Sequence, residues 1–223
     1  SFVDFSARRD HGRDAALQAA RAAWIGGAGG TSLVLAGREL GIELSGTMAH
    51  SYVMRFGRED EAFLAFARAY PGRAVLLIDT YDTLAAARTV AALAPRLRAE
   101  GIVPRAVRLD SGDLFELARS VRAILDDAGL ADVGIFASGD LDEYRIADLV
   151  QRDVPIDGFG VGTQLGTSGD APSLGVVYKL VEDTTGPKIK LAPGKLTLPG
   201  RKQVYRFADH GRAAFDVVAL ADE

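Results

Sequence analysis

Two kinds of apolar pattern alternate along the first 165 residues. Short and nearly continuous apolar runs predict strands that are buried on both faces, at residues 2–7, 42–47, 74–79, 106–109, 133–137 and 156–161. Longer stretches with apolar residues three or four positions apart predict amphipathic helices, at residues 15–24, 60–70, 82–100, 113–128 and 142–151. Residues 30–40 are expected to add a further strand and helix.

This alternation of strands and helices is typical of parallel βα units. The length of the succession favours an α/β barrel over an open, doubly wound sheet, although periodicity by itself allows both. We therefore predict that residues 1–165 form an irregular, TIM-like α/β barrel that is the catalytic domain.

The pattern changes near Gly166, where Pro and Gly begin to separate segments of period two. Such segments predict antiparallel strands and turns. We expect residues 166–223 to close the barrel in part and to contribute to a second, β-rich domain. Basic residues are frequent here, and either a solvated hairpin face or a phosphate-facing surface fits them; they are Lys179, Lys188, Lys190, Lys195, Arg201, Lys202 and Arg206.

Composition narrows the class of protein without naming it. A hydrophobic content of 48% with 25% charged residues describes an ordinary globular chain. The net charge of -4 gives no reason to expect a nucleic-acid partner, and the lack of cysteine excludes disulfides and thiolate metal sites.

No apolar run is long enough to span a membrane, so we expect a cytoplasmic protein. The opening SFVDFSARRD has no initiator Met, which indicates an upstream region.

Polar and small residues follow the predicted strands, where the active sites of α/β barrels lie. Arginines, hydroxyl residues, acids, glycines and one histidine would therefore converge on one face. This composition predicts a site for a phosphorylated, metal-bound substrate. The residues concerned are Arg8, Arg9, Gly30, Thr31, Ser32, His50, Asp79, Thr80, Asp82, Arg108, Asp110, Ser111, Asp113, Ser138, Gly139, Asp140, Gly160, Gly162 and Thr163.

The acidic residues at these strand ends fall into two groups. Asp113 and Asp140 are each followed three positions later by Glu, which is the capping-box spacing, so we predict that both cap helices, as Asp82 can also do. Asp79 and Asp110 each end an apolar strand three residues before a better cap candidate. We therefore predict that these two carboxylates bind Mg²⁺ or a ribose hydroxyl.

A glycine-rich turn follows the last predicted strand. Gly160, Gly162 and Thr163 could form only a tight turn, but loops after the late strands of such barrels commonly bind phosphate through backbone N–H groups. Ser138 and Gly139 on the preceding strand would complete a phosphate cradle.

Basic side chains near the other strand ends have two interpretations. Arg108 lies in an otherwise apolar strand and needs an anionic partner, which is either a structural acid or a ligand carboxylate. Arg8 and Arg9 can pair with nearby acids instead. Of the three histidines, His11 and His210 are expected to be structural.

Eight ordered motifs carry a resemblance that covers nearly the whole chain. The segments DFSARR, GGTSLVLAG, SGTMAHS, LLIDTYDT, VRLDSGDL, ASGDLDEY, GFGVGTQL and LPGRKQVYR together resemble the nicotinate phosphoribosyltransferase family. The resemblance implies condensation of nicotinate with 5-phosphoribosyl-1-pyrophosphate to nicotinate mononucleotide and pyrophosphate, in NAD salvage. It also implies an irregular α/β barrel with a β-rich domain, a homodimer with a shared active site, and ATP hydrolysis through a phosphohistidine.

Residue roles follow from the positions of these motifs. The resemblance implies that His50 is the phosphorylated histidine, that Asp110 contacts the ribose, and that Asp79 and Asp110 hold Mg²⁺. It places the 5′-phosphate on Ser138, Gly139, Gly160, Gly162 and Thr163. Arg8 and Arg108 would line the pyridine pocket, and Mg²⁺ and ATP would be the cofactors.

Ser32 bears on the choice between the acid and the amide. The related nicotinamide enzyme has Asp at this position, where a carboxylate would repel a substrate carboxylate. Ser32 can donate a hydrogen bond to a carboxylate, and two nearby arginines favour the acid further. The sequence therefore predicts nicotinate as the base.

Two alternatives and one departure stay open. A quinolinate phosphoribosyltransferase would need more basic residues in its base pocket, because its substrate has two carboxylates, and it has no use for a phosphorylated histidine. A catalytically silent nucleotide-binding barrel is the other alternative. The family also supplies an aromatic residue that stacks on the pyridine ring from its N-terminal segment, and this chain offers no candidate for it.

Overall fold

A parallel sheet forms the centre of the computed structural model, which describes residues 1–167, 169, 177–191 and 197–221. The sheet is five-stranded, with the order β1-β5-β4-β3-β2, and every neighbouring pair is parallel. Its strands are β1 (Phe2–Asp4), β2 (Val75–Leu77), β3 (Ala106–Leu109), β4 (Gly134–Ser138) and β5 (Gly158–Val161). The chain is therefore a mixed α/β protein, as its pattern predicts.

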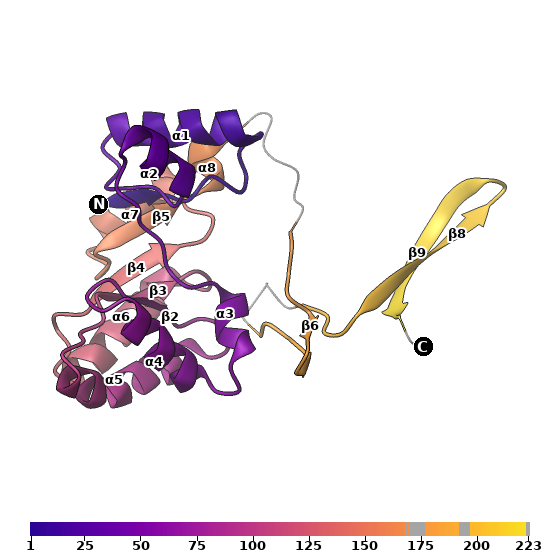
Figure 1. Cartoon of the computed structure of the whole chain (residues 1–223). Coiled ribbons are helices and arrows are strands. Elements are labelled where there is room, and N and C mark those ends of the chain that lie inside the picture. Colours follow the sequence, from indigo (N-terminus) through magenta and orange to yellow (C-terminus); the bar gives the residue numbers. More distant parts are fainter. Residues whose placement is uncertain (168, 170–176, 192–196, 222–223) are drawn as a thin grey trace.

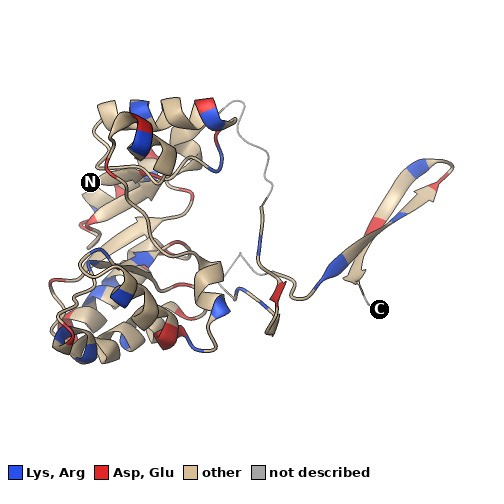
Figure 2. Ribbon diagram, viewed as in Figure 1, with Lys and Arg blue, Asp and Glu red and all other residues tan. Residues whose placement is uncertain are grey.

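Helices connect the strands and cover the sheet. Figure 1 shows α1, α2 and α8 grouped near β1 and β5, with α4 and α5 at the opposite end beside β2. The helices are α1 (Arg13–Ile25), α2 (Val34–Leu40), α3 (His50–Arg55), α4 (Glu59–Ala69), α5 (Thr83–Ala99), α6 (Leu114–Asp127), α7 (Glu143–Gln151) and α8 (Thr163–Gly166). Lys and Arg are interspersed with Asp and Glu over these helices (Figure 2).

Aspartates begin three of the helices. The side chain of Asp82 accepts a hydrogen bond from the Ala85 N–H at the start of α5, and Asp113 caps α6 in the same way, so these two predictions are confirmed. The prediction for Asp140 is wrong, because Asp142 caps α7. Asp140 instead has a φ of 49° in the turn before that helix, so its backbone does not lead into the helix.

The core lies between the strands and the helices α4 to α7. Leu76, Val107 and Ile135 on neighbouring strands are fully buried, and so is Phe63 of α4. Both faces of these strands are covered, which is why they read as continuous apolar runs rather than as alternating ones. A second, smaller cluster packs α1 against α2 through Ala20 and Ala36.

The strand predicted at residues 42–47 is wrong. Leu44 forms a single parallel bridge to Thr31, which in turn bridges to Asp4 at the end of β1. The apolar run is too short to continue the ladder, because Ser45, Gly46 and Thr47 follow it at once. Within the described residues β1 and β2 are the edge strands of the sheet, and no ladder joins them into a closed barrel.

Antiparallel pairs follow the parallel sheet, as the change of pattern predicts. Strands β6 (Glu182–Asp183) and β7 (Gly186–Pro187) form a short pair, and β8 (Lys202–Asp209) and β9 (Arg212–Leu220) form a long hairpin. Figure 1 shows this hairpin extending away from the body.

Lys195 lies outside the described residues, and the partition into domains at residue 165 stays a prediction. None of the described helices combines the length and apolarity needed to span a membrane.

Candidate functional site

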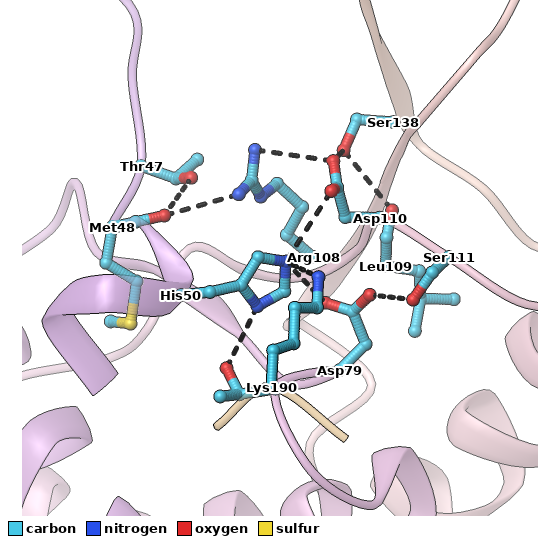
Figure 3. Close-up of polar contacts among 11 residues, drawn as sticks. Thr47, Met48, His50, Asp79, Arg108, Leu109, Asp110, Ser111, Ser138 and Lys190 are labelled. Atoms are coloured by element: carbon cyan, nitrogen blue, oxygen red, sulfur yellow. Dashed lines mark hydrogen bonds and ion pairs between the residues drawn. The ribbon is translucent and has the colours of Figure 1, made fainter. Parts of the chain in front are cut away.

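His50, Asp79 and Asp110 come together at the carboxyl ends of β2 and β3 (Figure 3). His50 is the first residue of α3, while each aspartate lies just beyond its strand. The His50 Nε2 atom is 3.9 Å from Asp79 Oδ1 and 3.6 Å from Asp110 Oδ2. One ligand atom of each residue lies within 4.8 Å of those of the other two. The parallel register of β2 and β3 thus brings the two aspartates to one edge, and the start of α3 adds His50.

Hydroxyl groups orient the two carboxylates. Ser111 Oγ donates to Asp79 Oδ2, and Ser138 Oγ donates to Asp110 Oδ1 at 2.7 Å. The Asp79 side chain is only 2% exposed, and its Oδ1 atom is buried with no hydrogen-bond partner among the described residues. A buried carboxylate oxygen is costly to leave unpaired, and oxygen ligands suit Mg²⁺. The donor set at Asp79 and Asp110 therefore fits a divalent cation.

Arg108 reaches the same cluster from β3. Its Nη2 donates to the Met48 carbonyl at 3.3 Å, and its Nη1 is 3.9 Å from Asp110 Oδ1, so a structural acid is close to this buried cation. Burial lowers the pKa of Arg108, the charges of Asp110 and Asp79 oppose this, and the positive charge of Arg8 adds to the lowering. The Arg108 Nε atom is buried without a hydrogen-bond partner among the described residues, so one donor is left for a ligand.

His50 is held at both ring nitrogens. Its Nδ1 lies 3.1 Å from Thr80 Oγ1, and its Nε2 lies 2.5 Å from Lys190 Nζ. Burial is the main cause that lowers the pKa of His50, the contacts with Asp110 and Asp79 oppose this, and the charge of Lys190 adds to the lowering. The imidazole is therefore neutral near pH 7, which is the form that acts as a nucleophile.

The residues predicted to bind phosphate lie on neighbouring strands. Ser138 is opposite Gly160 in the register of β4 and β5, and Gly162 directly precedes α8, which begins at Thr163. The turn after β4 contains Gly139, whose φ of 95° suits glycine. The structure thus gathers all five at adjacent strand ends, next to Asp110 through Ser138.

Gly160 also has a packing role. A Cβ atom at this position would lie 2.5 Å from two ring carbons of Phe5 and 3.1 Å from the ring of Phe136. The missing side chain makes room for these two rings, whose centroids are 5.9 Å apart. Packing therefore explains this glycine independently of any phosphate.

Ser32 lines a cavity whose lining does not include His50, Asp79 or Asp110. This cavity has a volume of about 570 Å³, and Ser45, Thr47 and Phe136 also line it. Ser138 and Gly139 line a different cavity of about 540 Å³ between α6 and α7. The structure therefore brings the histidine and the two acids together with Ser138, while the role of Ser32 as a base-binding residue stays a prediction.

Three contributors to the cluster were not assigned a role from the sequence. Thr80 and Ser111 directly follow the two aspartates, so their position after a strand was the available signal. Lys190 was one of seven basic residues near the C-terminus, and no local pattern distinguished it from the others. It is 1% exposed, which excludes the solvated-face interpretation for this lysine.

Comparison with known proteins shows the family of this chain. Residues 1–190 match the sequence model of the nicotinate phosphoribosyltransferase (NAPRTase) family. The chain is 56% identical over 209 residues to nicotinate phosphoribosyltransferase pncB2 of Mycobacterium tuberculosis, covering 94% of this chain and 45% of that protein. It is 42% identical over 231 residues to nicotinate phosphoribosyltransferase of Bacillus subtilis, covering 99% and 46%.

A solved structure gives the same result. The crystal structure of human nicotinic acid phosphoribosyltransferase aligns with a TM-score of 0.65 at 29% identity, covering all of this chain and 52% of the human chain. The chain thus spans about half the length of the relatives it matches. Since both the family model and the relatives match along most of its length, the chain belongs to the nicotinate phosphoribosyltransferase family.

Proposed function

We propose that the protein catalyses the condensation of nicotinate with 5-phosphoribosyl-1-pyrophosphate, which yields nicotinate mononucleotide and pyrophosphate for NAD biosynthesis. The observation that carries this proposal is the cluster of His50, Asp79 and Asp110 at the carboxyl ends of β2 and β3, in a chain of this family. Active sites of α/β proteins form at this edge, and buried acids with an unpaired oxygen suit a substrate bound through a cation.

Asp79 and Asp110 would hold Mg²⁺, which would neutralise negative charge on the departing pyrophosphate. Asp110 would also contact the ribose, and Ser138 keeps that carboxylate in place through its 2.7 Å hydrogen bond. The 5′-phosphate would bind at the ends of β4 and β5, to Ser138, Gly139, Gly160, Gly162 and Thr163. Holding both reactants in this geometry removes much of the entropic barrier to the transfer.

The base pocket would be formed by Arg8, Ser32 and Arg108. The free Nε donor of Arg108 supports a carboxylate ligand, because a buried guanidinium gains most from an anionic partner. Nicotinate has one carboxylate, whereas quinolinate has two. The described residues of the cluster offer Arg108 with Arg8 nearby, which favours the monoacid.

We further propose that ATP hydrolysis is coupled to this reaction through His50. The lone pair of Nε2 would attack the terminal phosphorus of ATP, the P–O bond to the β-phosphate would break, and ADP would leave with that electron pair. The neutral state of the imidazole supports this step. A silent scaffold would have no use for a buried neutral histidine between two acids.

The assembly is part of the proposal. We propose a homodimer with a shared active site, and an irregular barrel (residues 1–165) whose closure involves residues 166–223. The exposed apolar side chains of the β8–β9 hairpin, among them Val204, Phe207 and Phe215, support a partner for this segment.

Phosphate labelling tests the function. The protein is incubated with ATP labelled at the γ-phosphate, the acid-labile label is mapped, and pyrophosphate release is followed with nicotinate and with nicotinamide. We expect label on His50, its loss in His50→Ala, and release with nicotinate only. His210→Ala is the matched control, because this histidine is 95% exposed at the hairpin tip. Label that persists in His50→Ala would contradict the proposal.

A further inference from the structure

Lys190 is a buried lysine that contacts the candidate nucleophile. Lys190 is 1% exposed, and its Nζ atom lies 2.5 Å from the Nε2 atom of His50. The two residues are 140 positions apart in the sequence. Lysine is almost never fully buried unless its charge has a partner. The fold thus places a buried ammonium directly against the candidate nucleophile.

The segment that carries Lys190 is fixed against α3, the helix that begins with His50. The Lys190 backbone N–H donates to Thr197 Oγ1 at 3.0 Å. At the other end of α3, Arg55 Nε is 3.5 Å from Asp183 Oδ2. Figure 1 shows β6 beside α3 in accordance with this pair. The segment is thus held near both ends of the helix, so the approach of Lys190 to His50 is set by the fold.

The contact with Lys190 determines which nitrogen of His50 carries the lone pair. A lysine ammonium has three donors and no acceptor, so Nε2 must accept from it with its lone pair. The proton of the neutral imidazole is then on Nδ1, which donates to Thr80 Oγ1 at 3.1 Å. Nε2 is therefore the nucleophilic nitrogen, and the ammonium lies where a group bonded to Nε2 would be.

The charge around Nε2 favours a cation beside it. Asp79 Oδ1 and Asp110 Oδ2 lie 3.9 Å and 3.6 Å from Nε2, and unless both charges are fully offset by a bound Mg²⁺ they repel the oxygens of a phosphoryl group on this atom. The guanidinium of Arg108 is directed to the Met48 carbonyl and to Asp110 (Figure 3). Lys190 is the cation whose Nζ is within hydrogen-bond distance of Nε2.

We propose that Lys190 is a positioning residue that pairs with the phosphoryl group on His50 Nε2, an inference that rests on the proposed phosphohistidine. As the N–P bond forms and the bond to ADP breaks, the hydrogen bond of Lys190 moves from Nε2 to the phosphoryl oxygens. The imidazole nitrogen is a neutral acceptor, whereas the phosphoryl oxygens carry negative charge, so the attraction to the ammonium is stronger in the phosphorylated state, which gains stability. Docking of the segment around Lys190 thus becomes coupled to phosphorylation of His50.

Two phosphoryl donors separate this inference from the proposed function. The protein is phosphorylated with ATP and, separately, with phosphoramidate, which needs no ATP site. The extent of phosphorylation at His50 and the half-life of phosphohistidine after donor removal are measured by ³¹P NMR and mass spectrometry. The variants are Lys190→Met, Lys190→Arg and Lys188→Met, with circular dichroism to verify folding.

We expect Lys190→Met to lower the phosphorylated fraction and the phosphohistidine half-life, each by about tenfold, because one charged hydrogen bond is lost. Lys190→Arg should restore most of both quantities, which a purely structural role would not predict. Lys188→Met should stay within about twofold of the wild type, since the Lys188 ammonium pairs with Asp183 and Thr185 rather than with His50. Lys190→Gln serves the same comparison if the Met variant does not fold.

Each result that contradicts these expectations overturns one specific claim. A wild-type protein that takes no label at His50 from either donor overturns the proposed phosphohistidine. A labelled wild type with an equally labelled and equally long-lived Lys190→Met overturns the inference about Lys190 alone. An equal loss in Lys188→Met would show that packing of the segment, and not the charge at residue 190, is responsible, and this also overturns the inference.

Discussion

Single side chains in this chain are tuned by burial next to like charges, and Glu59 shows the effect most clearly. It lies in the first turn of α4, half-buried, and its Oε1 atom has no hydrogen-bond partner among the described residues. Burial raises the pKa of Glu59 to about 7, and the nearby charges of Asp79, Asp82 and Asp60 act in the same direction. The folded protein therefore holds this carboxyl protonated at mildly acidic pH.

The raised pKa of Glu59 predicts a loss of stability with rising pH. Between pH 4.5 and about 7 the native state binds the proton and the unfolded state does not, so the free energy of unfolding falls as the pH rises. After allowance for solvent screening, we expect a loss of about 1 kcal/mol between pH 5 and pH 8, which is absent in Glu59→Gln. Urea denaturation at both pH values, without divalent cations, measures it.

Glu61→Gln is the matched control, because Glu61 is exposed two positions further along the same helix. It should retain the wild-type decline with pH. If Glu59→Gln and the wild type lost stability in parallel, the assignment of this titration to Glu59 would be wrong.

At the level of the element, β5 depends on the absence of a side chain. All four of its residues are buried, and Gly160 leaves the space that the Phe5 ring occupies. We expect Gly160→Ala to lower the free energy of unfolding by about 1–3 kcal/mol, because the added methyl group overpacks a filled region. The midpoint of urea denaturation checks this without reference to activity.

Gly57→Ala provides the comparison, since a Cβ there would meet nothing within 4 Å. It should leave the midpoint nearly unchanged. Wild-type stability in Gly160→Ala would remove the packing explanation and leave phosphate binding as the reason for this glycine.

Helix starts show where local sequence is sufficient and where it is not. Asp82 and Asp113 were predicted as caps because a cap acts only on the next few backbone N–H groups. Asp140 was assigned to α7 by the same spacing, but Asp142 is the cap. Asp142 lacks a Glu three positions later, so the capping-box spacing favoured Asp140. The turn after β4, with positive φ at Gly139 and Asp140, makes Asp142 the cap instead.

At the level of the whole molecule, the body and the β8–β9 hairpin are energetically separate. The main core cluster runs from Met48 to Val161 and includes no hairpin residue. The hairpin exposes most of its side chains, and the stacking of Phe207 on Phe215 is internal to it. A two-stranded hairpin alone contributes little stability.

Truncation after Gly200 should therefore change the free energy of unfolding of the body by less than about 1 kcal/mol, because the core contacts remain. Phe63→Ala in the full chain is the contrasting variant. Its side chain is fully buried in the main cluster, and we expect a cost of about 3–5 kcal/mol. Thermal and urea unfolding compare the two. A truncated protein as unstable as Phe63→Ala would show that the hairpin supports the core.

The sequence by itself predicted the five strands of the parallel sheet and most of the helices between them, but not α3 or α8. This worked because the period of apolar residues depends on short-range geometry and on burial. It also predicted that Asp79 and Asp110 would lie close together, since parallel strands end at one edge. His50 does join them, but not at the end of a strand, because the strand predicted at residues 42–47 does not form. Their chemical roles stay predictions that the labelling experiment tests.

Only the tertiary structure decided that residues 42–47 form a single bridge, which residues line a cavity together with Ser32, and that Lys190 reaches His50. An edge strand forms only if a neighbour offers a ladder, and a cavity is made by side chains from distant segments. The contact between Lys190 and His50 joins positions 140 residues apart, and no local pattern records such a distance. It results from the way the C-terminal segment packs along α3.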